Sequence, residues 1–318
     1  MVRKLSFLCM SLLLLCFAIP MSSLGSDDKG SLRLALLPIP DVLPVYVALE
    51  KGYFKELGVR VEPLSVGSAV ERDQLMQAGK VDGMINEISG AANFNRDKNQ
   101  VKIISIARSP IGENPLFRIL AAPGSGITTV ADLAGVSIGI SKNTVIEYIS
   151  TRLLTTEGLA NDEIVYKSVP VLPERLQLLL QGQLKAVTLP DPLGAAAIKA
   201  GAIQIVNDTN KRDVSASVIT FSTESLKSKS ELVKKFMVAW DRAAQDLNQN
   251  PAAYEQLMLK KIRVPKNIQG EFAIPPMPIK ALPTKAQWDD VMAWMVDRNL
   301  IAAPLVYEES VTSDFLPK

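Results

Sequence analysis

Residues 71–86, ERDQLMQAGKVDGMIN, are matched 103 residues later by residues 174–189, ERLQLLLQGQLKAVTL. In each stretch an amphipathic helical pattern ends at a glycine, Gly79 or Gly182, and a short apolar run follows. Helices commonly end at glycine, and a short apolar run bounded by such a signal is typical of a buried strand. The match predicts the same helix–strand unit twice, although two unrelated arrays that obey the same rules can also share five identities.

The same alternation continues on both sides of these stretches. Further apolar runs predict strands at 32–37, 59–64 and 101–108 in the first array, and at 136–140, 163–169 and 203–206 in the second. Helical patterns lie between them, and one opens with the capping box Ser68-Ala69-Val70-Glu71. Strands that alternate with helices form parallel sheets covered on both faces. We therefore expect an α/β protein with two doubly wound, Rossmann-like lobes.

The lobe boundaries are expected where the pattern is interrupted. An extended apolar segment, 116–122, precedes the second array, and an alternating segment, 214–221, follows it. We assign lobe I to residues 30–118 plus 222–318 and lobe II to residues 119–221, with a two-strand hinge near 118 and 217. Long helices near 231–249, 251–262 and 285–298 complete lobe I. The tryptophans of these helices are expected in the core: Trp240, Trp288 and Trp294.

The N-terminal residues 1–25 have the features of an export signal. Arg3 and Lys4 precede an apolar run of about 14 residues, which is short for a membrane span of about 20. Small residues before a break at Gly25 fit a cleavage site. Cys16 follows Leu15, whereas a lipidated cysteine normally follows a small residue, so we do not expect lipid anchoring. The sequence predicts an exported, periplasmic protein.

Composition excludes several kinds of chemistry. The chain has no His, and both cysteines, Cys9 and Cys16, lie in the expected signal. The mature chain therefore has no Ser-His-Asp triad, cysteine nucleophile or Cys/His zinc site. Removing the two basic residues of 1–25 leaves 33 of the 35 Lys+Arg, against 33 Asp+Glu. This zero balance argues against nucleic-acid binding. Composition leaves carboxylate or lysine chemistry, oxygen-ligated metal ions, or no chemistry. Of these we expect the last, with no cofactor, no metal ion and no enzyme activity.

Several stretches resemble the substrate-binding proteins of ABC importers for sulfonates, nitrate, taurine and thiamine precursors. They are Ala48–Glu62, Gln77–Gly83, Val130–Gly139, Arg175–Val187 and Pro190–Pro192. The resemblance spans about residues 30–225 in the right order and implies the type II periplasmic binding protein fold. The same fold family includes a pyrimidine synthase of thiamine biosynthesis, which consumes its own histidine and uses a cysteine-rich loop. A chain without His and without mature Cys does not fit that activity.

The ligand site is expected where strand ends and helix starts of the two lobes converge. In doubly wound sheets, ligands bind beyond the carboxyl ends of the strands, where helix N-termini supply free N–H groups and partial positive charge. These loops are 38–43, 67–70 and 86–91 in lobe I, and 141–144, 169–172 and 189–193 in lobe II. The candidate ligand-binding residues are Pro40, Asp41, Tyr46, Gly67, Ser68, Asn86, Glu87, Ser89, Ser141, Asn143, Thr144 and Asp191.

Several candidates have a structural alternative. Asp41 and Asp191 can each be a helix N-cap, a position where Asp is common. Ser68 is expected to cap its helix first, and Tyr46 can belong to the core. Glu87 has less reason to be structural. Unpaired carboxylates in a closed cleft repel a bare anion, so the loops favour a neutral or amine-bearing small molecule.

Three functions fit these expectations. The first is a monomeric solute-binding component that captures a small organic molecule by hinge closure and delivers it to a cognate ABC permease. The second is an exported enzyme that uses Asp41, Glu87 and Asp191 as acid and base. The third is a sensory module that presents a solute to a membrane receptor. The sequence does not separate the first from the third.

Overall fold

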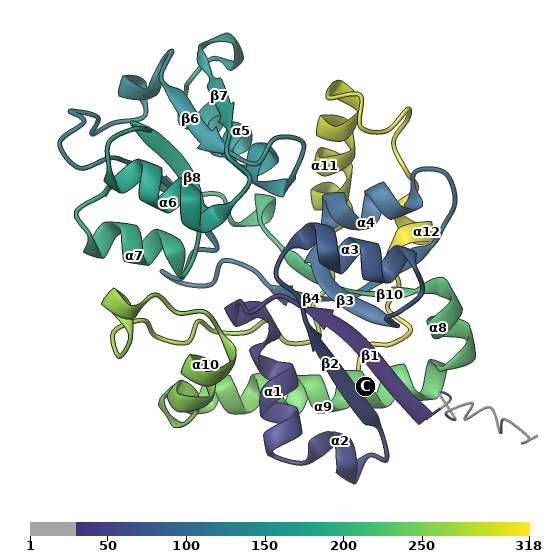
Figure 1. The fold of residues 1–318 in the computed structure, drawn as a ribbon. Coiled ribbons are helices and arrows are strands. Elements are labelled where there is room, and N and C mark those ends of the chain that lie inside the picture. The colour runs from purple at the N-terminus through teal and green to yellow at the C-terminus, as the bar shows by residue number, and fades with distance from the viewer. Residues whose placement is uncertain (1–29) are drawn as a thin grey trace, which may run out of the picture.

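The computed structural model describes residues 30–318 and contains two five-stranded sheets covered by helices (Figure 1). The first sheet has the order β2-β1-β3-β10-β4 and the second β7-β6-β8-β5-β9. The strands are β1 Ser31–Leu36, β2 Arg60–Ser65, β3 Gly83–Glu87, β4 Val101–Arg108, β5 Phe117–Ala121, β6 Ser137–Ile140, β7 Val165–Ser168, β8 Ala186–Pro190, β9 Ile203–Asn207 and β10 Ser217–Ser222. The two-lobed α/β fold expected from the sequence is confirmed.

Each sheet is mixed and follows one plan. In the first, β1 lies parallel to β2 and β3, and β10 is antiparallel to β3 and β4. In the second, β6 lies parallel to β7 and β8, and β5 is antiparallel to β8 and β9. The parallel part of each sheet aligns the carboxyl ends of three strands, so both lobes offer the loop edge at which ligands bind.

The shift of 103 residues recurs in the structure. The helices are α1 Leu43–Glu50, α2 Tyr53–Glu56, α3 Ala69–Gln77, α4 Ile88–Asn95, α5 Val145–Thr156, α6 Leu172–Leu180, α7 Leu193–Lys199, α8 Thr223–Ser228, α9 Ser230–Gln249, α10 Glu255–Lys261, α11 Lys285–Asp297 and α12 Tyr307–Ser310. Helix α3 and strand β3 reappear as α6 and β8 with both ends displaced by 103. The glycines that end the two helices, Gly79 and Gly182, both have positive φ. The sequence repeat therefore corresponds to a repeated helix–strand unit in the structure.

One expected boundary is wrong. We placed residues 217–221 in lobe II, but β10 pairs with β3 and β4 of the first sheet. The alternating Val, Ser, Ile and Thr side chains identify a strand without identifying the sheet that it joins. The chain crosses between the sheets within 109–116 and again within 208–216. Strand β5, which starts at Phe117, belongs wholly to the second sheet.

The core is continuous across the junction of the lobes. One cluster of buried residues contains Met84 and Ile88 of lobe I together with Ile119 and Ile149 of lobe II. Trp288 and Trp294 of α11 belong to this cluster, and Trp240 of α9 lies in the core of lobe I, so all three tryptophans are buried as expected.

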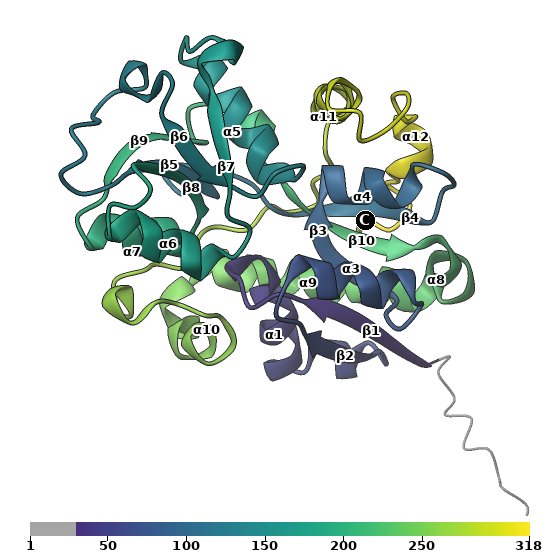
Figure 2. The same ribbon diagram turned by 45° about the horizontal axis from the view of Figure 1, so that its top comes forward.

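The C-terminal elements contact lobe II on two sides. Helix α11 accepts hydrogen bonds at Asp290 Oδ2 from Tyr148 Oη (2.6 Å) and Arg152 Nε (2.9 Å), both on α5. A segment with little regular structure, residues 262–283, reaches α7, where Lys199 pairs with Glu271 at 2.8 Å. Figures 1 and 2 show α10 and α11 beside opposite parts of lobe II. These contacts add to the two chain crossings that join the lobes.

The expected signal, residues 1–25, lies outside the described residues, as do Cys9 and Cys16. Within residues 30–318, none of the helices combines the length and apolar character needed to cross a membrane. The same residues contain no group of three or more His, Cys, Asp or Glu arranged to hold a metal ion.

Candidate functional site

Asp41 lies in a short 3-10 turn, Pro40–Val42, that follows β1 and leads into α1. Its side chain caps no helix; instead Oδ1 accepts a hydrogen bond from Arg108 Nη1 at 3.3 Å. Arg108 ends β4 and also donates to the carbonyl of Pro115 in the first crossing at 2.8 Å. Both side chains are buried. The ion pair therefore fixes the start of α1 to the strand that leads into the crossing.

Asp191 has a similar partner in lobe II. Arg118, on β5, donates from Nε and Nη2 to the two carboxylate oxygens at 2.8 and 2.9 Å. Asp191 Oδ1 also accepts the backbone N–H of Ala195 in α7 at 3.1 Å. Such a bidentate Arg–carboxylate pair is among the stronger hydrogen-bond arrangements in proteins. A side chain at Gly194 would meet it, because a Cβ there would lie 2.8 Å from Asp191 Oδ1.

Glu87, at the end of β3, is the third carboxylate with an arginine. Arg72 of α3 donates from Nη1 and Nη2 to its two oxygens at 3.3 and 3.2 Å, and from Nη1 to the carbonyl of Ile85 at 3.1 Å. Burial would lower the pKa of Arg72, but the carboxylates of Glu87 and Asp73 raise it above its usual value. Arg72 is therefore a buried, positively charged side chain that links α3 to β3.

These three pairs correct the electrostatic argument made from the sequence. That argument treated Asp41, Glu87 and Asp191 as unpaired. In the structure each carboxylate lies against an arginine that sits outside the candidate loops. A carboxylate that is paired with an arginine repels an anion much less than an unpaired carboxylate does. The preference for a neutral or amine-bearing ligand therefore loses its basis.

Arg175 occupies in α6 the place that Arg72 occupies in α3. Its Nη1 donates to the carbonyl of Thr188, which corresponds to Ile85 under the shift of 103. Its Nε donates to the carbonyl of Val169, and its Nη2 to Ser141 Oγ and again to Val169. All of these acceptors are neutral. Burial lowers the pKa of Arg175 to about 10.

The loop before α5 carries three predicted residues. Thr144 caps the helix, because its Oγ1 accepts the N–H of Ile146 at 3.2 Å. Asn143 has φ 59°, and its N–H donates to Glu147 Oε2 at 2.6 Å. Glu147 is in turn paired with Arg298, which follows α11, at 2.5 Å. The loop is thus held by its own helix and by the C-terminal segment.

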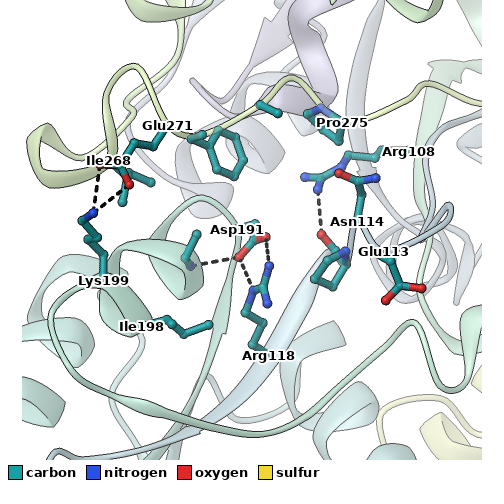
Figure 3. Close-up of a pocket in the computed structure, with 14 residues that line it drawn as sticks. Arg108, Glu113, Asn114, Arg118, Asp191, Ile198, Lys199, Ile268, Glu271 and Pro275 are labelled. Carbon is teal, nitrogen blue, oxygen red and sulfur yellow. Dashed lines mark hydrogen bonds and ion pairs between the residues drawn. The ribbon is translucent and has the colours of Figure 1, made fainter.

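A cavity of about 340 Å³ opens where β5, α7, the first crossing and residues 268–275 meet (Figure 3). Arg108, Arg118 and Asp191 line it, so one whole ion pair, Arg118–Asp191, and the arginine of a second converge here. The remaining lining residues are Glu113, Asn114, Pro115, Ala195, Ile198, Lys199, Ile268, Glu271, Phe272, Ala273 and Pro275. Its walls come from both lobes, and its acidic and basic side chains are balanced.

The other predicted residues lie away from this cavity. Ser68 caps α3 by accepting the N–H of Glu71 at 3.2 Å, and Gly67 donates its own N–H to the Glu71 carboxylate. Asn86 accepts a hydrogen bond from Thr220 inside the first sheet. Tyr46 packs against the core of lobe I with the ammonium of Lys261 4.9 Å from its ring centre. Pro40 and Ser89 are buried in the first turns of their helices.

Asp208 ties the two crossings together. It follows β9, and its carboxylate accepts the backbone N–H groups of Leu116 and Phe117 at 3.0 and 3.1 Å. The residue is fully buried, and this burial raises its pKa to about 6. Sequence reasoning missed Asp208 and the four arginines. For two of these arginines the sequence held one signal: Arg72 and Arg175 are identical residues at matching positions of the repeated stretch.

A family model described as NMT1/THI5 like matches residues 39–254. The chain belongs to the NMT1/THI5-like family. This confirms the resemblance noted in the sequence. Among curated proteins, it is 31% identical over 119 residues to a 4-amino-5-hydroxymethyl-2-methylpyrimidine phosphate synthase of Saccharomyces cerevisiae, a match that covers 36% of this chain and only 33% of the synthase.

Solved structures with the same fold include members of ABC import systems. The alkanesulfonate-binding protein SsuA from Xanthomonas axonopodis pv. citri, bound to MOPS, is 17% identical with a TM-score of 0.73, over 89% of this chain and 98% of that one. The ligand-binding component of an ABC-type import system from Staphylococcus aureus, with zinc bound, is 12% identical with a TM-score of 0.71, over 90% of this chain and 97% of that one. At these identities the likeness establishes the fold.

Proposed function

We propose that this member of the NMT1/THI5-like family is the extracytoplasmic solute-binding component of an ABC importer. It captures a small organic solute between its two lobes, closes about the crossings at 109–116 and 208–216, and is recognised by a membrane permease. The observation that carries the proposal is the pair of similar five-stranded lobes, between whose sheets the chain crosses twice, within 109–116 and 208–216. We also propose that the protein is exported and acts as a monomer.

The state of the carboxylates favours binding over catalysis. An acid–base pair needs one carboxyl group that holds a proton and one that accepts it. Asp41, Glu87 and Asp191 instead each accept hydrogen bonds from an arginine of their own lobe. The enzyme alternative therefore gains no support from the site. The sensory alternative uses the same lobes and differs in the membrane partner.

The proposal predicts that ligand raises the melting temperature and reduces the radius of gyration. A ligand that binds only the native state stabilises it by mass action, and one that contacts both lobes favours the closed form. We would screen by thermal shift a panel headed by alkanesulfonates, since the Xanthomonas protein is alkanesulfonate-binding, with nitrate, pyrimidines, amines and aromatic acids beside them. Solution scattering of the best hit would follow.

Four outcomes separate the functions. A melting shift with a smaller radius of gyration supports capture by closure. A shift with an unchanged radius at saturation contradicts the hinge mechanism. Conversion of the bound compound to a product, followed by mass spectrometry, would replace the binding protein with the enzyme. Transport by a reconstituted permease from the same genome, dependent on this protein, would separate the importer from a sensory module.

A further inference from the structure

The C-terminal elements contact lobe II on two sides that differ in strength. On one side α11 packs against α5, where Trp294 and Tyr148 are buried with their ring centres 5.5 Å apart. The Tyr148 hydroxyl donates to Asp290 at 2.6 Å, and the buried carboxylate of Glu147 pairs with Arg298 just after α11. Large apolar side chains and a buried carboxylate in an ion pair make this contact costly to separate.

The second chain crossing belongs to the same side. Val214 and Ala216 of this crossing lie in the buried cluster that also contains Trp294 and Tyr148. Packed interiors resist deformation, because their side chains interdigitate with few voids. A rotation of lobe II that leaves this cluster intact must therefore pivot beside α11 and the second crossing.

On the other side, α7 meets residues 262–283 through few contacts. Lys199 pairs with Glu271 at 2.8 Å, and both side chains are at least half exposed. The Asn267 side chain donates to the carbonyl of Ala196 at 2.9 Å. We call these two polar contacts the clasp. Of the described residues of lobe II, Ala196 alone belongs to the buried core cluster of lobe I. An exposed ion pair, one hydrogen bond and one methyl group attach this side only weakly.

The cavity of about 340 Å³ lies on this weaker side. Helix α7 supplies Ala195 and Ile198 to one wall, and Phe272 lies in the facing segment. Figure 3 shows the Lys199–Glu271 pair at one edge of the cavity. Where two surfaces leave such a gap, their atoms forgo van der Waals contacts. The gap therefore weakens the attachment of α7 further, and the clasp lies at its margin.

Building on the proposed function, we propose that lobe II opens on its α7 side and pivots beside α11 and the second crossing. The solute enters the cavity between α7 and residues 267–275, and the clasp closes after it. Helix α11 keeps its contacts with lobe II in both states. The clasp thereby regulates access to the proposed solute site.

Thiol labelling tests this route, because both native cysteines lie within residues 1–25 and the mature chain has none. Ala195→Cys places a reporter in the cavity wall, and Val291→Cys places one in the buried part of α11. Lys199→Glu sets two carboxylates against each other. Adding Glu271→Lys restores an ion pair with its charges exchanged.

We expect Lys199→Glu to raise the rate of N-ethylmaleimide labelling at Ala195→Cys at least about threefold, because an exposed ion pair is replaced by a repulsion of similar size. The exchanged pair should return that rate to its original value. The rate at Val291→Cys should stay the same in every background. A rate at Ala195→Cys that responds to neither charge variant would overturn the clasp, and a rise at both reporters would overturn the pivot beside α11.

Distances between spin labels separate a movement of lobe II from a local lifting of residues 262–283. One pair joins exposed positions on the α7 side, Ala200→Cys after α7 and Glu50→Cys in α1. The other joins Thr156→Cys in α5 and Asp297→Cys in α11, which are also exposed. With Lys199→Glu, double electron–electron resonance should show a longer component for the first pair alone. Lengthening of both pairs, or of neither, would overturn the proposed opening.

These measurements use no ligand, so their failure is distinct from failure of the proposed function. If the reporters contradict the clasp while a solute still reduces the radius of gyration, the protein captures its solute by another movement and the proposed function stands. If the reporters behave as expected while no permease depends on the protein for transport, the opening on the α7 side stands and the importer role does not.

Discussion

Replacing Asp208 by Asn should remove a pH dependence of stability that originates at the junction of the lobes. Asp208 is fully buried and joins the second crossing to the N–H groups of Leu116 and Phe117 in the first. Burial raises its pKa from 3.8 to about 6. The folded protein therefore binds this proton more tightly than the unfolded chain does.

The sign of the effect follows from that difference. Below pH about 4 the group is protonated in both states, and its favourable contribution is fully present. As the pH rises through about 6 the folded state must ionise a buried carboxyl, and that contribution is lost. A difference of about 2 pKa units corresponds to about 3 kcal/mol of unfolding free energy between pH 4 and 7. The Asn variant cannot titrate and lacks this loss.

Urea unfolding followed by circular dichroism, at intervals from pH 4 to 7.5, measures the effect. Other carboxylates titrate in both proteins, so the quantity to plot is the free energy of unfolding of wild type minus that of Asp208→Asn. Asn keeps one acceptor and loses the second, which offsets the whole curve by a constant of about 1 kcal/mol. The difference should fall with rising pH, with its midpoint below 6. Parallel curves for the two proteins would refute the reasoning.

Three further substitutions test other parts of the structure. Gly194→Ala places a Cβ 2.8 Å from Asp191 Oδ1; we expect a disrupted ion pair and at least about tenfold weaker solute binding, measured by calorimetry, because misplaced site groups cost binding free energy. Gly83→Ala places a Cβ 2.9 Å from the ring of Phe221 and should lower the free energy of unfolding by about 1–3 kcal/mol in urea titration, with Gly67→Ala, whose Cβ meets an ordinary 3.5 Å contact, as control. Lys199→Met removes an exposed ion pair and should change stability by less than about 1 kcal/mol; a larger loss would show that residues 262–283 depend on it.

Much of the architecture followed from local signals. The capping box at Ser68 and the glycines at 79 and 182 marked the ends of α3 and α6, and the apolar runs marked the strands, because these features depend on neighbours in sequence. The sheet to which Ser217–Phe221 belong was not predictable, since pairing with β3 or with β8 satisfies the same alternating pattern.

The ion-pair partners of the site carboxylates could not be predicted from the sequence, for a related reason. Arg108 and Arg118 read as ordinary strand residues, and only the fold brings the first to Asp41, 67 positions away, and the second to Asp191, 73 positions away. Helix caps and ligand contacts were weighed for Asp41, whereas an ion pair requires knowledge of the tertiary partner. The net charge that a ligand meets in a cleft can therefore be judged only once the tertiary structure is known.

The ion pairs within each lobe are more buried than two of the pairs that join the C-terminal elements to lobe II. The pairs Asp41–Arg108, Glu87–Arg72 and Asp191–Arg118 each lie within one lobe, and every arginine in them is at least four-fifths buried. Breaking a buried pair costs several kcal/mol, so closure that leaves these pairs intact costs little. Lys199–Glu271 and Arg152–Asp290 join the C-terminal elements to lobe II and are much more exposed, which makes them weak. The proposed closure must therefore either keep α11 with lobe II or separate its buried contacts there, among them Glu147–Arg298 and the shared core cluster.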